Sequence, residues 1–214
     1  MRTRILQSIV VCLTAVLTGC ATAYYETMEK FGVHKRDILV DNIEEARDSQ
    51  EAAKEQFASA LEEFIAVLDY DGGELESKYN ALNKELERSE ARANDVRDRI
   101  EDVERVAAAL FKEWETELEQ YNSAELRRQT QQQLYDTQRR YDTLIAAMRR
   151  AEARLEPALV PFRDQVLFLK HNLNAQAVAS LQDELVVIET DVSALIAEME
   201  TAIAEANAFI AQMK

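Results

Sequence analysis

The sequence predicts an all-α protein: a long antiparallel four-helix bundle with coiled-coil-like heptad packing, behind a lipoprotein signal peptide. Three observations lead to this fold class. The 214 residues include only four glycines and two prolines, so few turns interrupt the chain. Apolar residues recur at alternating spacings of three and four along four long stretches. Short turn segments separate these stretches, which makes neighbouring helices antiparallel.

The first nineteen residues, 1–19, have the pattern of a bacterial lipoprotein signal peptide. A basic start is followed by an apolar run over residues 5–16, which is too short to span a bilayer as a mature helix. The run leads into Leu17-Thr18-Gly19-Cys20, a lipobox whose small residues let the peptidase approach the bond. We therefore expect cleavage before Cys20 and a thioether-linked lipid on its thiol. An ordinary signal peptide or an uncleaved anchor is the alternative.

This signal also predicts where the protein lies. Residues 20–33 would tether it to the periplasmic face of a bacterial envelope membrane, and Ala21 in place of an aspartate favours the outer membrane. Tyr24 and Tyr25 would either lie at headgroup level or begin the first helix. Because Cys12 leaves with the signal peptide and Cys20 carries lipid, no thiol remains for a disulfide, a metal site or a nucleophile.

The first two predicted helices cover residues 34–70 and 74–121. Asp71-Gly72-Gly73 separates them, since glycine supplies the positive φ that a helix C-cap and a tight turn require. The second helix keeps heptad register from Leu75 to Trp114, and Tyr121 returns to it, which indicates left-handed coiled-coil packing. The core stripe of the first helix consists of Ile43, Ala46, Gln50, Ala53, Phe57, Ala60, Phe64 and Val67.

The third helix follows a turn at Asn122-Ser123, where Ser123 is the expected N-cap. Its heptad stripe continues from Leu134 to Phe162. Two prolines interrupt it, and each removes a backbone donor and crowds the preceding turn. A kink or short break is therefore expected near Glu156.

The fourth helix covers residues 175–213, with Asn174 as its N-cap. Residues 34–214 would then form one domain, with its amino end, the second turn and its carboxyl end together at one end of a rod. Two splayed hairpins, 34–121 and 124–213, are the alternative, because heptad stripes do not fix how many helices associate. The solvated outer face of the fourth helix is expected to be acidic, through Glu184, Glu189, Asp191, Glu198, Glu200 and Glu205.

The sequence contains no constellation that points to catalysis. His34 and His171 lack the neighbours of a zinc motif and would lie at opposite ends of the bundle. The Glu-x-x-His pair of di-iron bundles, the phosphate loop and the dinucleotide fingerprint do not occur. We expect a non-enzymatic protein without cofactor or metal. A formal charge of −15, or −17 without Arg2 and Arg4, also argues against nucleic acid as a partner.

Two stretches stand out against this acidic background. The paired arginines of the third helix would bind an anionic envelope polymer or, as we expect, pair with acids of the second and fourth helices. The run 162–175 is apolar nearly all round, so it belongs either to the core or to a partner surface. We expect Phe162, Val166 and Leu169 to be core. The candidate interaction residues are Arg149, Arg150, Arg154, Phe162, Arg163, Lys170 and His171.

Four segments carry a resemblance to a known family. They are Met28-Glu29-Lys30-Phe31-Gly32-Val33-His34-Lys35-Arg36-Asp37, Asp71-Gly72-Gly73-Glu74-Leu75, Met148-Arg149-Arg150-Ala151-Glu152-Ala153-Arg154-Leu155-Glu156-Pro157, and the run 162–175. In these segments the chain resembles a family of uncharacterised proteobacterial lipoproteins, a domain of unknown function. The resemblance implies a helical envelope lipoprotein with no assigned activity, and it carries over no catalytic or binding residue.

The expected function is that of a structural or scaffolding rod, anchored to the membrane by its lipid, that holds or spaces an unknown envelope protein or polymer. Homo-oligomers stay among the expected partners. The alternative is a periplasmic holdase, or a binder of lipid or another hydrophobic ligand, that uses a groove between helices. A holdase should have a poorly filled core or a large apolar groove, whereas a scaffold should be fully packed.

Overall fold

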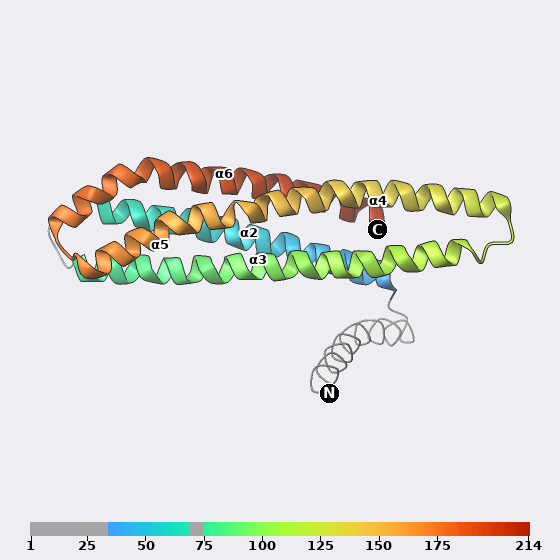
Figure 1. Ribbon diagram of the computed structural model, residues 1–214, viewed down its shortest axis with the longest axis horizontal. Coiled ribbons are helices and arrows are strands. Elements are labelled where there is room, and N and C mark those ends of the chain that lie inside the picture. Colours follow the sequence, from blue (N-terminus) through green and yellow to red (C-terminus); the bar gives the residue numbers. More distant parts are fainter. Residues whose placement is uncertain (1–33, 69–74) are drawn as a thin grey trace, which may run out of the picture.

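The computed structural model describes residues 34–68 and 75–214, and these form a rod of α-helices without a strand (Figure 1). The expected all-α bundle is confirmed. Residues 1–33, with the predicted signal peptide and tether, lie outside the described residues, as does the predicted Asp71-Gly72-Gly73 turn. The helices are Lys35–Leu68 (α2), Leu75–Leu118 (α3), Ala124–Ala153 (α4), Leu155–His171 (α5) and Ala175–Met213 (α6).

The helices close into one bundle. Helix α2 packs along both α3 and α6, and the continuous pair α4 and α5 fills the remaining side, where it contacts α3 and α6 (Figure 1). Chain direction alternates along the rod, as short connections require. The extensive packing of α2 on α6 joins the first and the last helix of the chain. It excludes the alternative of two splayed hairpins.

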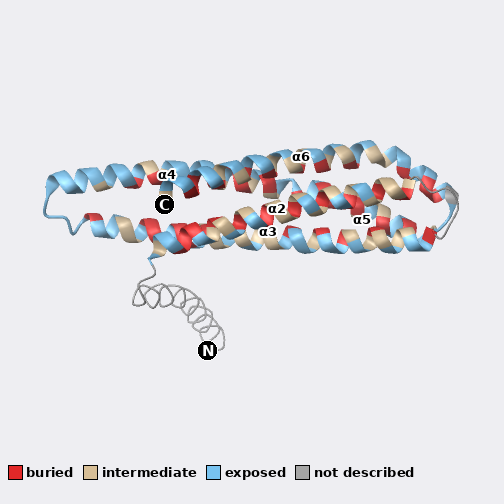
Figure 2. Cartoon of the chain, turned by 180° about the vertical axis from the view of Figure 1, so that it is seen from behind, coloured by how far each residue is buried: buried red, intermediate tan, exposed pale blue. Residues whose placement is uncertain are grey.

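The predicted heptad stripes form the core. Every position of the first stripe, from Ile43 to Val67, is buried, and the buried apolar residues of all five helices belong to one continuous cluster. Figure 2 shows these buried residues along the inner sides of the helices. Gln50 is the polar residue of this otherwise apolar stripe. Its side chain is fully buried, and its amide nitrogen and oxygen have no hydrogen-bond partner among the described residues.

The helix break lies at Arg154, two residues before the predicted position at Glu156. Arg154 keeps near-helical angles (φ −86°, ψ −13°), and its N–H bonds to the carbonyl of Ala151 at 3.1 Å, one residue closer than in an α-helix. Pro157 has no N–H for the Ala153 carbonyl, and its ring crowds that carbonyl. The irregular turn therefore falls on the residues before the proline.

Both predicted N-caps are confirmed. The Ser123 hydroxyl accepts a hydrogen bond from the Leu126 N–H at 3.3 Å. The Asn174 side-chain oxygen accepts one from the Ala177 N–H at 3.0 Å. Each satisfies an amide of the first helical turn that has no partner within its own helix.

The prediction that the solvated outer face of α6 is acidic is wrong. Most of its carboxylates are half-buried, because Glu184, Asp191, Glu198 and Glu205 follow one another at spacings of seven and flank the core stripe at a single heptad position. Among the expected acids only Glu200 is exposed. The exposed ridge is otherwise largely small and uncharged: Ala179, Ser180, Val186, Val187, Thr190, Ser193, Ala197, Thr201, Ala204, Asn207, Ala208 and Ala211.

Helices α3 and α4 continue past the ends of α2 and α6 (Figure 1). The first turn of α2 is fixed at the level of Glu113, whose carboxylate receives the Lys35 ammonium at 2.8 Å. Residues 115–133 lie beyond this level, and we call them the overhang. Within it Leu118 is buried, whereas nearly every residue from 119 to 133 is exposed. Tyr121, expected to return to the heptad stripe, is 40% exposed because no third helix covers it.

Candidate functional site

The paired arginines in the middle of the bundle contact acids on neighbouring helices. Arg149 of α4 donates from Nε to Glu104 of α3 at 2.9 Å, makes a second bond to the same carboxylate, and also donates to Glu152. The hydrogen bond to Glu104 raises the pKa of Arg149. Arg150 donates from Nε to Glu198 of α6 at 3.3 Å. Both arginines therefore pair within the bundle, as the intramolecular interpretation expects.

A second charged network bridges the helix break. Arg163 of α5 donates to Glu90 of α3 at 2.8 Å and to Glu156 at 3.1 Å, and Arg97 of α3 also donates to Glu156. The bond to Glu90 raises the pKa of Arg163, and the bond from Arg163 lowers the pKa of Glu156. These side chains are substantially exposed, so each pair contributes about 0 to 1 kcal/mol. Arg154 is exposed and has no side-chain partner among the described residues.

Replacing Arg149 and Arg150 by glutamine is expected to lower the free energy of unfolding by only about 1 kcal/mol, because both pairs are partly exposed. Urea unfolding followed by circular dichroism measures it. Arg139→Gln is the matched control, since Arg139 pairs only within its own helix, with Asp136 at 2.6 Å. If partner capture disappears while the unfolding curve is unchanged, the two arginines form a docking surface instead.

The run 162–175 divides between core and surface. Phe162, Val166 and Leu169 are buried as expected, and the Phe162 ring packs edge-on against Phe64 of α2, with ring centroids 5.7 Å apart. Lys170 and His171 end α5 and are exposed. The remaining large apolar side chains of the run, Leu167, Phe168 and Leu173, are also exposed.

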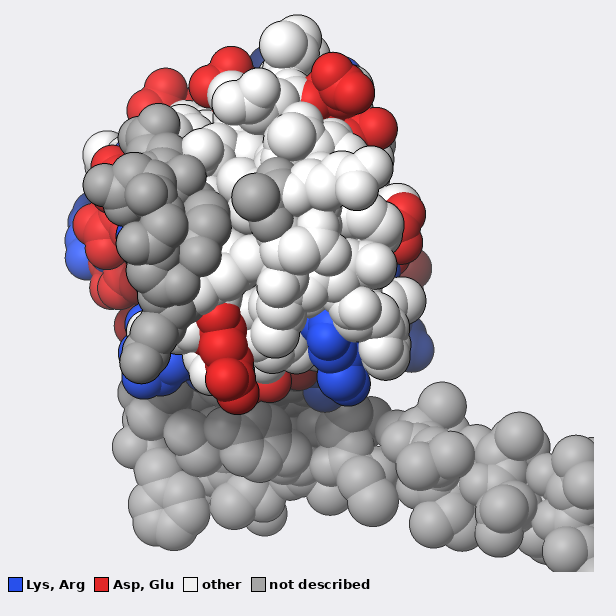
Figure 3. Space-filling model, turned by 90° about the vertical axis from the view of Figure 1, so that its left-hand side faces the viewer, with Lys and Arg blue, Asp and Glu red and all other residues white. Residues whose placement is uncertain are grey.

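These side chains contribute to a largely uncharged surface at the far end of the rod. Figure 3 shows that end: uncharged residues cover the middle of the surface, and acidic and basic residues lie around it. Among the described residues, exposed large hydrophobic side chains lie in two regions only. One region is the overhang and the start of α4 beside it. We call the second region the far-end patch; it consists of Val160, Leu167, Phe168, Leu173, Val186 and Val187.

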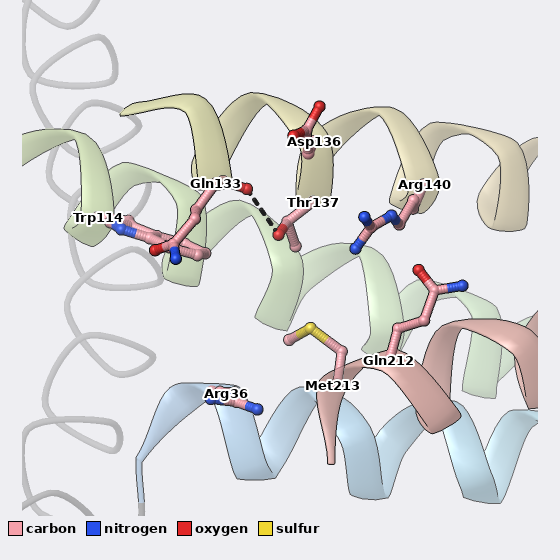
Figure 4. Close-up of a pocket in the computed structure, with 8 residues that line it drawn as sticks. All are labelled: Arg36, Trp114, Gln133, Asp136, Thr137, Arg140, Gln212 and Met213. Carbon is pink, nitrogen blue, oxygen red and sulfur yellow. Dashed lines mark hydrogen bonds between the residues drawn. The ribbon is translucent and has the colours of Figure 1, made fainter. Parts of the chain in front are cut away.

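A hollow of about 350 Å³ lies at the opposite end, where the four-helix core stops and the overhang begins (Figure 4). Four helices line it: α2 through Arg36, α3 through Trp114, α4 through Arg140 and its neighbours, and α6 through Gln212 and Met213. No pattern in the sequence indicates it. The hollow depends on the stagger between helix ends, and the heptad pattern carries no information on this stagger.

An aromatic pair packs near the same end of the core. Tyr141 of α4 lies edge-on to Phe111 of α3, with ring centroids 5.4 Å apart, and its ring is half-buried. Burial raises the pKa of Tyr141 to about 12, and the negative charge of Glu104 adds to this effect. The folded protein thus disfavours the phenolate, because the charged form would lose its hydration.

The raised pKa predicts a loss of stability in alkali. Below pH 10 both the folded and the unfolded chain keep the Tyr141 proton, so the contribution is fully present. Between pH 10 and about 12 only the unfolded chain ionises, and the free energy of unfolding falls by about 3 kcal/mol in total. Tyr141→Phe should flatten this slope in urea titrations. Tyr135→Phe, which removes the hydroxyl of an exposed ring on the same helix, is the matched control.

Fold and surfaces together define an all-α helical-bundle protein. None of its described helices has a stretch long and apolar enough to cross a bilayer. Among the same residues, no three potential metal ligands come together.

The chain belongs to the family described as Protein of unknown function (DUF2959), whose profile matches residues 24–213. The resemblance to a family of unknown function is thereby confirmed. Among curated proteins, none matches the chain.

Proposed function

We propose that this protein is a non-enzymatic, lipid-anchored rod that holds or spaces a partner in the periplasm, on the outer membrane of a bacterial envelope. The observation that carries the proposal is the continuous core, to which all five helices contribute. At about 1.5 Å per residue, the 44 residues of α3 alone extend about 65 Å. A filled core of this length resists bending and keeps its two ends a fixed distance apart.

The two ends of the rod differ in a way that suits this role. The described chain begins at His34, beside the overhang, and lipid on Cys20 would tether the rod there through residues 20–33. The opposite end carries the far-end patch. An exposed apolar surface on a protein of formal charge −15 marks a place where a partner can be held without charge repulsion.

The holdase alternative has less support. A holdase needs an extended apolar groove for unfolded chains, whereas the helix stripes of this protein are packed against one another along the rod. The hollow beside the overhang is confined to one end, and arginine and glutamine side chains share its lining with Trp114 and Met213.

Photo-crosslinking in intact cells tests the proposal. A photoreactive amino acid replaces Leu167 in the far-end patch, and Arg92, exposed midway along α3, provides the control position. We expect a discrete adduct from position 167 and none from position 92. Heterogeneous adducts from both positions, together with suppression of client aggregation by the purified protein, would establish the holdase instead.

A further inference from the structure

We propose that the hollow beside the overhang binds a small phosphate-bearing amphiphile, with its head between Arg36 and Arg140 and its apolar part against Trp114 and Met213. The inference does not rest on the lipid anchor, because every residue that carries it belongs to the described bundle. Its failure and that of the proposed function are therefore distinguishable.

Two arginines that line the hollow have no anionic partner among the described residues. Acidic residues outnumber lysine and arginine by 40 to 25, and arginines elsewhere in the described bundle, such as Arg99 and Arg149, pair with carboxylates. Arg36 and Arg140 are exposed and line the same hollow, yet neither has an ion pair or a side-chain hydrogen bond among the described residues. They come from α2 and α4, and Figure 4 shows both beside the open space. An anion between two unpaired guanidiniums gains charge-assisted hydrogen bonds from both.

The one acid that lines the hollow does not occupy this position. Asp136 accepts hydrogen bonds from Arg139 at 2.6 Å and from Gln132 at 3.1 Å. Figure 4 shows its carboxylate turned away from the space between Arg140 and Met213. The positive charge that faces the hollow is therefore not neutralised from within.

Part of the lining of the hollow is apolar. Trp114 and Met213 line the hollow, are partly buried and pack against the core. An indole and a thioether offer adaptable contact to an acyl chain, while the Gln212 amide, on the same helix end as Met213, provides hydrogen-bond donors. A volume of about 350 Å³ admits a head group with a short length of chain. A longer anionic polymer would meet the surrounding acidic surface.

The test uses the full chain in a nonionic detergent, with Trp114 as reporter because it is the only tryptophan of the sequence. The probes are dihexanoyl phosphatidic acid, dihexanoyl phosphatidylcholine and inorganic phosphate. We expect phosphatidic acid to change the Trp114 emission saturably, and to bind at least tenfold more weakly to the Arg36→Gln, Arg140→Gln chain. Isothermal titration calorimetry provides a second measurement that does not depend on fluorescence.

Arg92→Gln, Arg127→Gln is the matched control. It removes the same charge from two exposed arginines that have no side-chain partner among the described residues and lie outside the hollow. Its affinity for phosphatidic acid should stay within twofold of the unaltered chain. Displacement of phosphatidic acid by inorganic phosphate would identify a free phosphate as the ligand, and no displacement would identify a lipid. Three outcomes overturn the proposal. Phosphatidylcholine binds as tightly as phosphatidic acid, the control loses as much affinity as the Arg36→Gln, Arg140→Gln chain, or neither phosphatidic acid nor inorganic phosphate causes a heat or emission change.

Discussion

Phe162→Ala is expected to lower the free energy of unfolding by about 3 to 5 kcal/mol, which is the usual cost of truncating a fully buried phenylalanine. Phe162 is 2% exposed and packs edge-on against Phe64 of α2, so its loss opens a cavity between the helix after the break and the first helix. Domains of this kind have a total stability of about 5 to 15 kcal/mol. The change would therefore remove a large share of it. Urea unfolding followed by circular dichroism measures the effect.

Phe168→Ala provides a control of the same substitution on the same helix. Because Phe168 is 41% exposed in the far-end patch, we expect a cost below about 1 kcal/mol. Equal losses for the two variants would contradict the packing of α5. A Phe162→Ala, Leu169→Ala chain that stays stably folded but loses its partner would identify these residues as a binding site rather than as core.

Cys20→Ser is expected to release the protein from the membrane fraction completely. Each methylene of an acyl chain contributes about 0.8 kcal/mol to membrane binding, so several chains on one cysteine hold firmly and their loss leaves no comparable anchor. Cys20 lies outside the described residues, and this prediction rests on the lipobox alone. Cell fractionation with a high-salt wash measures the distribution.

Cys12→Ser is the matched control, because Cys12 precedes the expected cleavage site and should not affect retention. A Cys20→Ser chain that stays in the membrane pellet after the wash would refute the lipobox interpretation. Sucrose-gradient fractionation separates the two membranes of the envelope. Co-migration with inner-membrane markers would refute the outer-membrane proposal that rests on Ala21.

Most of the fold could be predicted because the helices follow local rules. The stripe from Ile43 to Val67 is buried because residues three and four apart share one side of a helix, whichever helix lies opposite. Ser123 and Asn174 cap their helices through bonds that span three residues. Such features depend only on neighbours in the sequence, and no tertiary knowledge is needed to identify them.

The hollow depends instead on how far helices extend past one another. Arg36 and Arg140 are far apart in sequence, and they line one hollow only because α2 begins at the level of Glu113. No pattern in the sequence specifies this stagger. The largely uncharged ridge of α6 is not predictable for a related reason: residue spacing alone does not show that neighbouring helices half-bury the acids beside it.

The overhang has a consequence for how the rod opens. A helix pair that buries little surface can separate at a small free-energy cost, whereas the four-helix region opens only when the whole core does. Nearly every residue from 119 to 133 is exposed, and Leu118 and Leu134 are the buried side chains that flank this segment. Its amide hydrogens should therefore exchange with solvent through local fraying, much faster than those in the middle of α3. The free-energy cost of local opening therefore varies along the rod. It is low in the overhang, beside the residue where the described chain begins, and higher towards the far-end patch.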